Sequence, residues 1–251
     1  MKKTAAIILA AGKGTRMKSD KPKVIFELAE KPMINRVVQT ANKINSDLIA
    51  IVVGYKKDQV INVVPKNSNI KFVEQVQQNG TGHAVMVTEE IFHDFDGDVF
   101  ILCGDVPLLR YKTLEKIQQQ HREDNASCTV LTAFMNDALK YGRIVRNSGG
   151  NVQRIVEFKD ATEAEKEIKE INTGIYCFDA KDLFEALQNI DNNNNQNEYY
   201  LTDTLEILND KDKLVTSVIL DDMVEASGVN SKEQLADLEN EFLSRQNHFE
   251  G

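Results

Sequence analysis

Strand-like and helix-like segments alternate through the first 134 residues of this chain, and this order constrains its fold more than any other feature. The strand-like segments are apolar and β-rich, as expected for strands buried in a parallel sheet. They cover residues 5–10, 48–53, 70–74, 99–103 and 127–134, and helical segments are expected at 32–45, 57–64, 82–92 and 111–123. Right-handed crossovers between such strands place helices on both faces of one sheet. The sequence therefore predicts an α/β fold with a Rossmann-like, mostly parallel mixed sheet.

The pattern changes after residue 140, where shorter strands and turns replace the regular alternation. Residues 149–151, Gly-Gly-Asn, form a hairpin signal. A final helix is predicted from Ser231 to about residue 245, because Ser231 is a suitable N-cap and Gln234 completes a capping box. Its apolar face would contain Leu235, Leu238 and Phe242. The other elements expected here are strands at 142–146, 152–158 and 171–178, helices at 162–167 and 180–190, and an exposed polar loop at 192–196.

Composition and charge exclude several classes of protein. A chain of 251 residues with 41% hydrophobic residues can bury one large α/β core, so we expect a single domain. No apolar run approaches the roughly 20 residues needed to span a membrane, and no cleavage site follows the first residues, which predicts a cytoplasmic protein without a membrane partner. The net charge of -9 and the absence of tryptophan argue against a nucleic-acid surface. Cys103, Cys128 and Cys177 lack CxxC spacing and are expected to be reduced and buried, and the four histidines lack the spacing of zinc ligands.

A basic, glycine-bearing loop follows the first strand directly. It reads Leu-Ala-Ala-Gly-Lys-Gly-Thr-Arg-Met-Lys-Ser-Asp-Lys-Pro-Lys at residues 9–23, with five cations within eleven residues. Gly12 and Gly14 would let backbone N–H groups approach phosphate oxygens, and Arg16 and Lys23 are among the cations. A methionine stands where a dinucleotide fingerprint needs its third glycine, and the Gly-Lys-Ser/Thr ending of a P-loop is missing. The loop predicts a triphosphate cradle, with a solvated basic turn as the alternative.

Two oxygen-bearing side chains are candidates for holding a hard cation. Asp105 follows the apolar strand 99–103, so it would emerge at the carboxyl edge of the sheet near the glycine loop. Mg²⁺ prefers oxygen ligands and takes several of them from phosphates and water, so one acid and one neutral oxygen would suffice. Asn230 before the final helix could supply the second oxygen. Both residues are also common in ordinary turns, which is the competing interpretation.

Two further polar segments suit a base and a sugar. Gln75 can pair with a donor and an acceptor on a base edge, and the amides near Gly80 and Thr81 can reach a ring carbonyl, which suits a pyrimidine. The alternative is a simple helix start with glycine at the cap. Gly142, Glu157 and Asn172 lie in turns or at strand ends of the second half, where they could grip hydroxyl and N-acetyl groups or could be ordinary loop residues.

Nine short motifs of the chain, taken together, resemble those of a known family. Over residues 5 to about 240 the chain resembles the uridylyltransferase (pyrophosphorylase) domain of bacterial N-acetylglucosamine-1-phosphate uridylyltransferases. The first motif indicates only the wider sugar nucleotidyltransferase superfamily, whereas those at 170–174 and 198–203 indicate this member. In chain order the motifs are Ile-Leu-Ala-Ala-Gly-Lys-Gly-Thr-Arg-Met (8–17), Lys-Pro-Lys-Val (21–24), Gly-Thr-Gly-His-Ala (80–84), Gly-Asp-Val-Pro-Leu (104–108), Tyr-Gly-Arg (141–143), Glu-Phe-Lys-Asp-Ala (157–161), Glu-Ile-Asn-Thr-Gly (170–174), Glu-Tyr-Tyr-Leu-Thr-Asp (198–203) and Gly-Val-Asn (228–230).

The resemblance implies the nucleotide-diphospho-sugar transferase fold and a role for each matching residue. Arg16 and Lys23 would be catalytic contacts to phosphate, and Asp105 with Asn230 would bind Mg²⁺. The expected reaction joins UTP and N-acetylglucosamine 1-phosphate into UDP-N-acetylglucosamine and pyrophosphate, by in-line attack on the α-phosphate. The expected division within residues 1–251 is a nucleotide-binding half (1–110), a sugar-binding half (111–230) and a C-terminal helix (231–251). The remaining substrate contacts would be Leu9, Ala10, Ala11, Gly12, Gly14, Gln75, Gly80 and Thr81 for the nucleotide, and Gly142, Glu157, Asn172, Tyr199 and Thr202 for the sugar.

The chain departs from the family in two respects. Full-length members usually continue into a left-handed β-helix with acetyltransferase activity and trimer contacts, so we expect no acetyl transfer here and leave the oligomeric state open. Cys103 stands where relatives commonly have an aromatic residue, which would loosen sugar selectivity slightly. Two alternative functions remain: a nucleotidyltransferase for another sugar phosphate or nucleotide, and a non-catalytic module that binds a sugar nucleotide. The presence of the phosphate and metal residues favours an enzyme.

Overall fold

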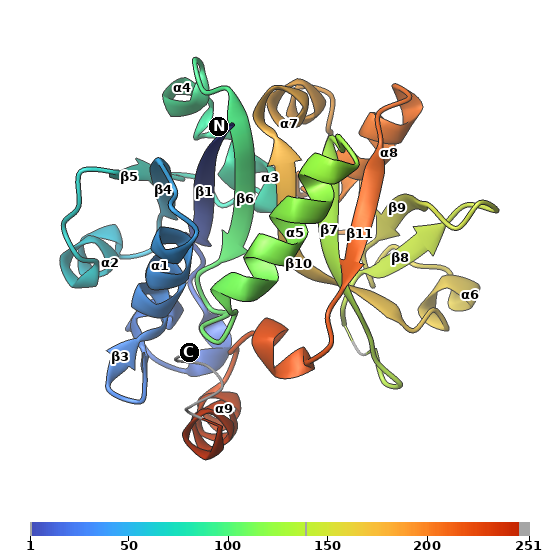
Figure 1. Cartoon of the computed structure of the whole chain (residues 1–251). Coiled ribbons are helices and arrows are strands. Elements are labelled where there is room, and N and C mark those ends of the chain that lie inside the picture. The colour runs from blue at the N-terminus through green and yellow to red at the C-terminus, as the bar shows by residue number, and fades with distance from the viewer. Residues whose placement is uncertain (1, 139, 246–251) are drawn as a thin grey trace.

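The computed structural model describes residues 2–138 and 140–245, and its central feature is one mixed sheet (Figure 1). In these residues nine strands form the sheet, and β10 runs antiparallel to both of its neighbours, whereas the other pairs along the main path are parallel. This confirms the predicted mostly parallel α/β sheet. In spatial order the strands are β11 (Val215–Ile219), β7 (Cys128–Phe134), β10 (Glu170–Asp179), β6 (Gly97–Cys103), β1 (Lys3–Ala10), β4 (Leu48–Val53) and β5 (Ile70–Glu74). Off this path, β8 (Arg143–Arg146) pairs with β10, and β9 (Val152–Val156) pairs with β8.

Helices cover both faces of this sheet, as predicted. The side chains of β1 show why, because successive residues of a strand point to opposite faces. Ala6 and Ile8 pack into one core, Ala5 and Ile7 pack into the other, and all four are fully buried. Among the described residues, no helix combines the length and the apolar character needed to cross a membrane. The first core is covered by α1 (Met33–Lys43), α2 (Lys57–Val63) and α5 (Tyr111–Glu123), and the second by α3 (Thr81–Met86), α7 (Ala180–Leu187) and α8 (Asp203–Asp210).

Several elements differ from the sequence prediction. The helix expected at 82–92 is two short helices, α3 and α4 (Glu89–Phe92). Thr88 lies between them, and its hydroxyl donates to the carbonyl of Val85 at 2.7 Å, which competes with continuation of the helix. The small antiparallel ribbon of β2 (Glu27–Leu28) and β3 (Lys31–Pro32) was not predicted, and neither were α8 and β11. The two ribbon strands have two residues each, which is too few for a hydrophobic period to be read.

The final helix α9 (Lys232–Ser244) begins where the sequence predicts, but one capping bond differs. Ser231 Oγ accepts from the backbone N–H of Gln234 at 3.2 Å, whereas Gln234 Oε1 accepts from the backbone N–H of Asn230 at 2.8 Å instead of closing on Ser231. The expected apolar face packs against the N-terminal loop, with Leu238 and Phe242 in one cluster with Met17. The helix therefore holds Asn230 near the loop after β1, where its Oδ1 accepts from Arg16 and Lys23. Residues 246–251 of the expected C-terminal segment lie outside the described residues.

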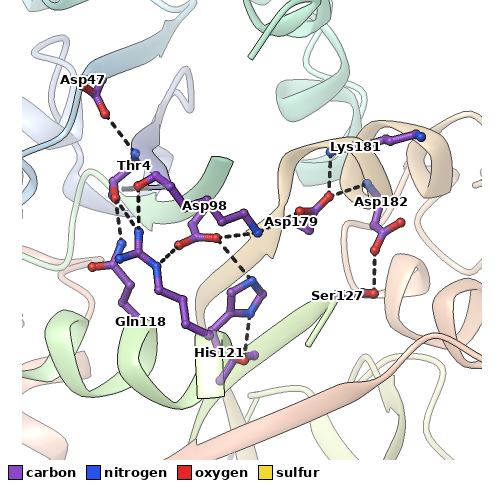
Figure 2. A network of polar contacts seen from close by, with 12 residues as sticks. Thr4, Asp47, Asp98, Gln118, His121, Ser127, Asp179, Lys181 and Asp182 are labelled. Carbon is purple, nitrogen blue, oxygen red and sulfur yellow. Dashed lines mark hydrogen bonds and ion pairs between the residues drawn. The ribbon is translucent and has the colours of Figure 1, made fainter. Parts of the chain in front are cut away.

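A buried polar cluster lies at the amino-terminal ends of β1 and β6, away from the carboxyl edge. Figure 2 shows Asp98, which is fully buried, at its centre. The carboxylate contacts Arg122 Nε at 2.6 Å and Lys2 Nζ at 2.9 Å, and it lies 3.8 Å from His121 Nε2. Burial lowers the pKa of His121, because a charged imidazole loses hydration there. The cluster therefore favours a neutral His121 in the folded chain.

This neutral histidine predicts how stability depends on pH. As pH falls below about 6.5, the unfolded chain binds a proton at His121 that the folded chain resists, so the free energy of unfolding should decrease. Asp203 acts in the opposite direction, because burial raises its pKa to about 6 and its protonation favours the folded chain. We therefore expect His121→Gln to remove part of the acid-induced loss that wild type shows in urea unfolding between pH 7.5 and 5. His93→Gln, at a side chain 81% exposed, should leave the curve unchanged. If wild type and His121→Gln lost the same free energy of unfolding between pH 7.5 and 5, His121 would not be a source of the acid-induced loss.

Candidate functional site

The carboxyl ends of β1 and β6 and the residues after β5 surround a cavity of about 270 Å³. A Cβ added at Gly12 would meet no atom within 4 Å, so the backbone of the loop is open to this space. Most residues of the expected nucleotide site line the cavity, although Gly14 lies behind it against Lys23. The lining residues are Leu9, Ala10, Ala11, Gly12, Lys23, Val24, Gln75, Gln78, Gly80, Thr81, Ala84, Asp105 and Glu198.

Lys23 joins three sequence-distant segments at one side of the cavity. Its Nζ contacts Asp105 Oδ2 and donates a hydrogen bond to Asn230 Oδ1 at 2.9 Å. Arg16 Nη2 donates to the same Asn230 oxygen at 2.8 Å. The side chains of Lys23 and Asp105 are only 16% and 20% exposed, so their attraction is screened less than on an open surface. The structure thus brings the two expected metal ligands and the two expected phosphate-binding cations together.

Backbone geometry holds these side chains in place. Gly14 has φ of 62°, and a Cβ there would lie 2.6 Å from Lys23 Cβ, so only glycine allows the loop to fold this closely on Lys23. Asp105 comes two residues after β6, and its carbonyl accepts from the backbone N–H of Val229 at 3.0 Å. This bond positions the loop before α9 independently of the Asp105 carboxylate.

The donor set at this place fits a divalent cation that takes most of its ligands from a substrate. A carboxylate oxygen of Asp105 and a carboxamide oxygen of Asn230 already share one cationic partner, the Lys23 ammonium. The described residues contain no group of three or more His, Cys, Asp or Glu side chains that could hold a metal alone. Two oxygens without a full protein cage match the way proteins bind Mg²⁺, with phosphates and water as the other ligands.

The base-binding candidates form the other side of the cavity. Gln75 follows β5 and is 3% exposed, and its Nε2 lies 3.1 Å from the Gly80 carbonyl. Gly80 has φ of 109° and ψ of 175°, a region essentially restricted to glycine. A Cβ at Gly80 would lie 2.5 Å from the Tyr199 carbonyl, which accepts from the Gly82 N–H at 2.8 Å. Glycine at residue 80 is therefore needed for residues 199–201 to dock on this loop.

Gly80→Ala should weaken the fold at this junction. We expect the free energy of unfolding to fall by about 1–3 kcal/mol, because alanine cannot adopt this backbone conformation without strain and would also meet Tyr199. Urea unfolding measures the change. Gly12→Ala is the matched control, because a Cβ there meets no atom within 4 Å and the stability should stay near wild type. Equal stability of the two variants would contradict the role of residue 80.

Four of the sugar-binding candidates form two hydrogen-bonded pairs, Gly142 with Asn172 and Glu157 with Thr202. Asn172 lies beside Gly142, whose carbonyl accepts from the Asn172 N–H at 2.9 Å, and Asn172 Nδ2 donates to the Tyr176 hydroxyl at 2.7 Å. The Glu157 carboxylate accepts from the Thr202 hydroxyl at 3.3 Å, and burial raises the pKa of that carboxyl. Tyr199 comes from the segment docked on Gly80 and Gly82. Sequence reasoning did not find Tyr176, because it resembles any buried strand residue.

Other residues near the cavity were also missed or misjudged. Gln78 and Glu198 line it, although neither was assigned a role from the sequence; Glu198 opens the motif at 198–203. His83 stands inside the quoted motif at 80–84 and contacts Gln75, but it received no role. Cys128 and Cys177 are buried as predicted, whereas Cys103 is partly exposed, with its Sγ 3.6 Å from the Gly174 carbonyl. The prediction of a buried Cys103 was therefore wrong, because the residue ends β6 at the open edge of the sheet.

Comparison with known sequences places this chain in a family. The nucleotidyl transferase family matches residues 5–225. The bifunctional protein GlmU of Lactococcus lactis is 44% identical over 243 residues, which are 97% of this chain and 53% of the relative. The bifunctional protein GlmU of Acetivibrio thermocellus is 46% identical over 232 residues, which are 92% of this chain and 50% of the relative. The chain thus spans about half the length of these curated relatives.

Solved structures agree on the fold. The structure of apo UDP-glucose pyrophosphorylase has a TM-score of 0.79 and 19% sequence identity, covering 98% of this chain and all of the other. The complex of UDP-glucose pyrophosphorylase with UDP-glucose has a TM-score of 0.74, also at 19% identity and with the same coverage. The predicted nucleotide-diphospho-sugar transferase fold is confirmed by this likeness. From the family match over residues 5–225, the chain belongs to the nucleotidyl transferase family.

Proposed function

We propose that this chain transfers uridylyl from UTP to N-acetylglucosamine 1-phosphate, giving UDP-N-acetylglucosamine and pyrophosphate. The observation that carries this proposal is the meeting of Lys23, Asp105 and Asn230 beside a cavity that has Gln75 on its other side. Cations with a paired oxygen set suit a triphosphate, and a buried carboxamide suits a base edge. The match to relatives named bifunctional protein GlmU, of which this chain spans about half the length, supports the proposal.

The chain's own residues would act by positioning and by charge stabilisation. A sugar phosphate is already ionised at neutral pH, so the attack needs no protein nucleophile or general base. Arg16 and Lys23 would hold the phosphates of UTP and stabilise charge that develops at the α-phosphate and on the leaving pyrophosphate. Asp105 and Asn230 would hold Mg²⁺, which when bound neutralises phosphate charge as a Lewis acid.

Sugar recognition is proposed for the second half of the chain. Gly142, directly before β8, and Asn172, near the start of β10, would contact the sugar together with Glu157, and Tyr199 and Thr202 would lie nearby. The resemblance at 170–174 and 198–203 supports this assignment, because those motifs separate this member from the wider superfamily. The corresponding division is a nucleotide-binding half at 1–110, a sugar-binding half at 111–230 and a C-terminal segment at 231–251 that contains α9. The proposed location of the reaction is the cytoplasm.

A substrate panel tests this function. Pyrophosphate release is measured with UTP, CTP, ATP and GTP, each against the 1-phosphates of N-acetylglucosamine and glucose, with and without Mg²⁺. Glucose 1-phosphate is included because the structural neighbours are UDP-glucose pyrophosphorylases. We expect the highest kcat/KM with UTP and N-acetylglucosamine 1-phosphate in the presence of Mg²⁺. Preference for glucose 1-phosphate would change the assigned sugar, and binding without turnover would identify a non-catalytic module.

A further inference from the structure

We propose that His83 is a positioning residue that orients the Gln75 carboxamide, so that the nucleotide pocket selects a base with a protonated ring nitrogen. This inference rests on the proposed use of UTP. It is carried by a contact between two side chains: Gln75 Nε2 lies 3.0 Å from His83 Nδ1. His83 belongs to α3 and stands three residues after Gly80, whose carbonyl accepts from the same carboxamide.

The hydrogen-bond partners fix which way the Gln75 carboxamide points. The atom of Gln75 that lies 3.1 Å from the Gly80 carbonyl oxygen must be a donor, because a carbonyl oxygen only accepts. This atom is therefore Nε2. The His83 Nδ1 atom beside the same Nε2 must then act as an acceptor, which places the ring proton of a neutral His83 on Nε2 of the imidazole.

Neither residue of this pair is free to move away. The backbone N–H of Gln75 donates to the Val53 carbonyl at 2.8 Å, which extends the contact between β4 and β5, and the side chain is 3% exposed. The His83 ring lies beside the Tyr199 ring, with centroids 6.3 Å apart and an angle of 33° between the planes. His83 thus connects the base-binding residue to the segment that docks on Gly80.

The consequence is that Gln75 presents one kind of group to a ligand. Its two Nε2 hydrogens are directed to Gly80 and His83, which leaves Oε1 as the group for a base. An acceptor at this place complements the N3–H of uracil and faces a lone pair on N3 of cytosine. The orientation therefore favours uridine over cytidine nucleotides. A methyl group at C5 leaves N3–H in place, so it should not affect this selection.

His83→Phe tests the inference, because phenylalanine keeps a ring beside Tyr199 but has no acceptor. With UTP we expect KM to rise about tenfold, which corresponds to about 1.4 kcal/mol, while kcat changes little, because the hydrogen bond that fixes the carboxamide is lost before the chemical step. The ratio of kcat/KM for UTP over CTP should fall by a similar factor. The ratio for UTP over 5-methyl-UTP should not change, because both bases carry N3–H.

His83→Asn and His93→Phe are the matched comparisons. Asparagine places a carboxamide oxygen near the position of Nδ1, so it should restore most of the UTP-over-CTP selectivity, and the exposed His93 should tolerate phenylalanine without effect on either ratio. Unchanged selectivity in His83→Phe would overturn the inference, and so would a loss in His83→Asn equal to that in His83→Phe. If His83→Phe does not fold, the same ratio of kcat/KM for UTP over CTP is measured with His83→Ala, which also lacks the acceptor, and an unchanged ratio there would overturn the inference. A wild type with no preference for UTP over CTP would instead overturn the proposed uridine substrate.

Discussion

Lys23→Ala is expected to lower turnover by at least about 100- to 1,000-fold, the usual cost of removing one donor that stabilises transition-state charge. The Lys23 ammonium is the group that meets both Asp105 and Asn230, and it faces the cavity proposed for the triphosphate. Steady-state pyrophosphate release measures the effect. The matched control is Lys21→Ala in the same basic loop, where the exposed ammonium lies over the Phe26 ring at 5.2 Å, and its turnover should stay within a few-fold of wild type.

The same variant separates phosphate binding from metal binding. In the free protein the Lys23 ammonium contacts the two oxygens that we assign to the metal, so it competes with a divalent cation for them. Lys23→Ala should therefore bind Mn²⁺ alone at least as tightly as wild type, as measured by calorimetry, despite its low turnover. Near-normal turnover would remove Lys23 from the mechanism. Weaker Mn²⁺ binding would show that Lys23 helps to build the metal site and does not compete for it.

Asp105→Ala is expected to reduce turnover by at least about 100- to 1,000-fold as well, because it removes the one carboxylate of the proposed metal site. The fold should survive, since Val229 is held by the backbone carbonyl of Asp105 and not by its carboxylate. Calorimetry should show a loss of Mn²⁺ binding, in contrast to Lys23→Ala. Circular dichroism and urea unfolding check that the variant remains folded.

Asp20→Ala is the control for Asp105→Ala. Its carboxylate is 95% exposed, and its contact with Lys56 Nζ is long, at 3.8 Å. Surface pairs of this kind contribute little, so neither turnover nor Mn²⁺ binding should change measurably. A folded Asp105→Ala protein with wild-type turnover would exclude Asp105 as a metal ligand. If Asp105→Ala lost turnover but still bound Mn²⁺ as tightly as wild type, the cation would be held by other residues in the free protein.

The order of secondary structure was predictable from local patterns. The run Leu48–Val53 matches the observed strand β4, because an apolar, β-branched segment between turn signals has few other ways to bury its side chains. The position of β10 was not predictable. It lies between β6 and β7 and antiparallel to both, a pairing decided by long-range packing. The two-residue strands β2 and β3 carry too few residues for their period to be read.

The candidate site divides in a similar way. The residue types at 12–23 and at 105 indicated phosphate and cation chemistry without any structure, since glycine and cationic residues after a buried strand have a restricted use. The role of Asn230 came from the family resemblance, because an asparagine beside an N-cap is ordinary turn chemistry. The partners of Gln75 and the contact of Tyr176 with Asn172 could not be predicted, because they depend on side chains meeting across different elements.

The sequence by itself determined which local elements form and which chemical groups the chain can offer, because strand and helix periodicity, glycine conformation and side-chain charge are properties of neighbouring residues. Only the tertiary structure decided which of these groups meet. Asn230 reaches Lys23 because α9 packs its apolar face on Met17 and Leu28, and Gly80 reaches Tyr199 because no side chain separates the two backbones. These distances result from burying apolar surface contributed by the whole chain, which no local segment specifies.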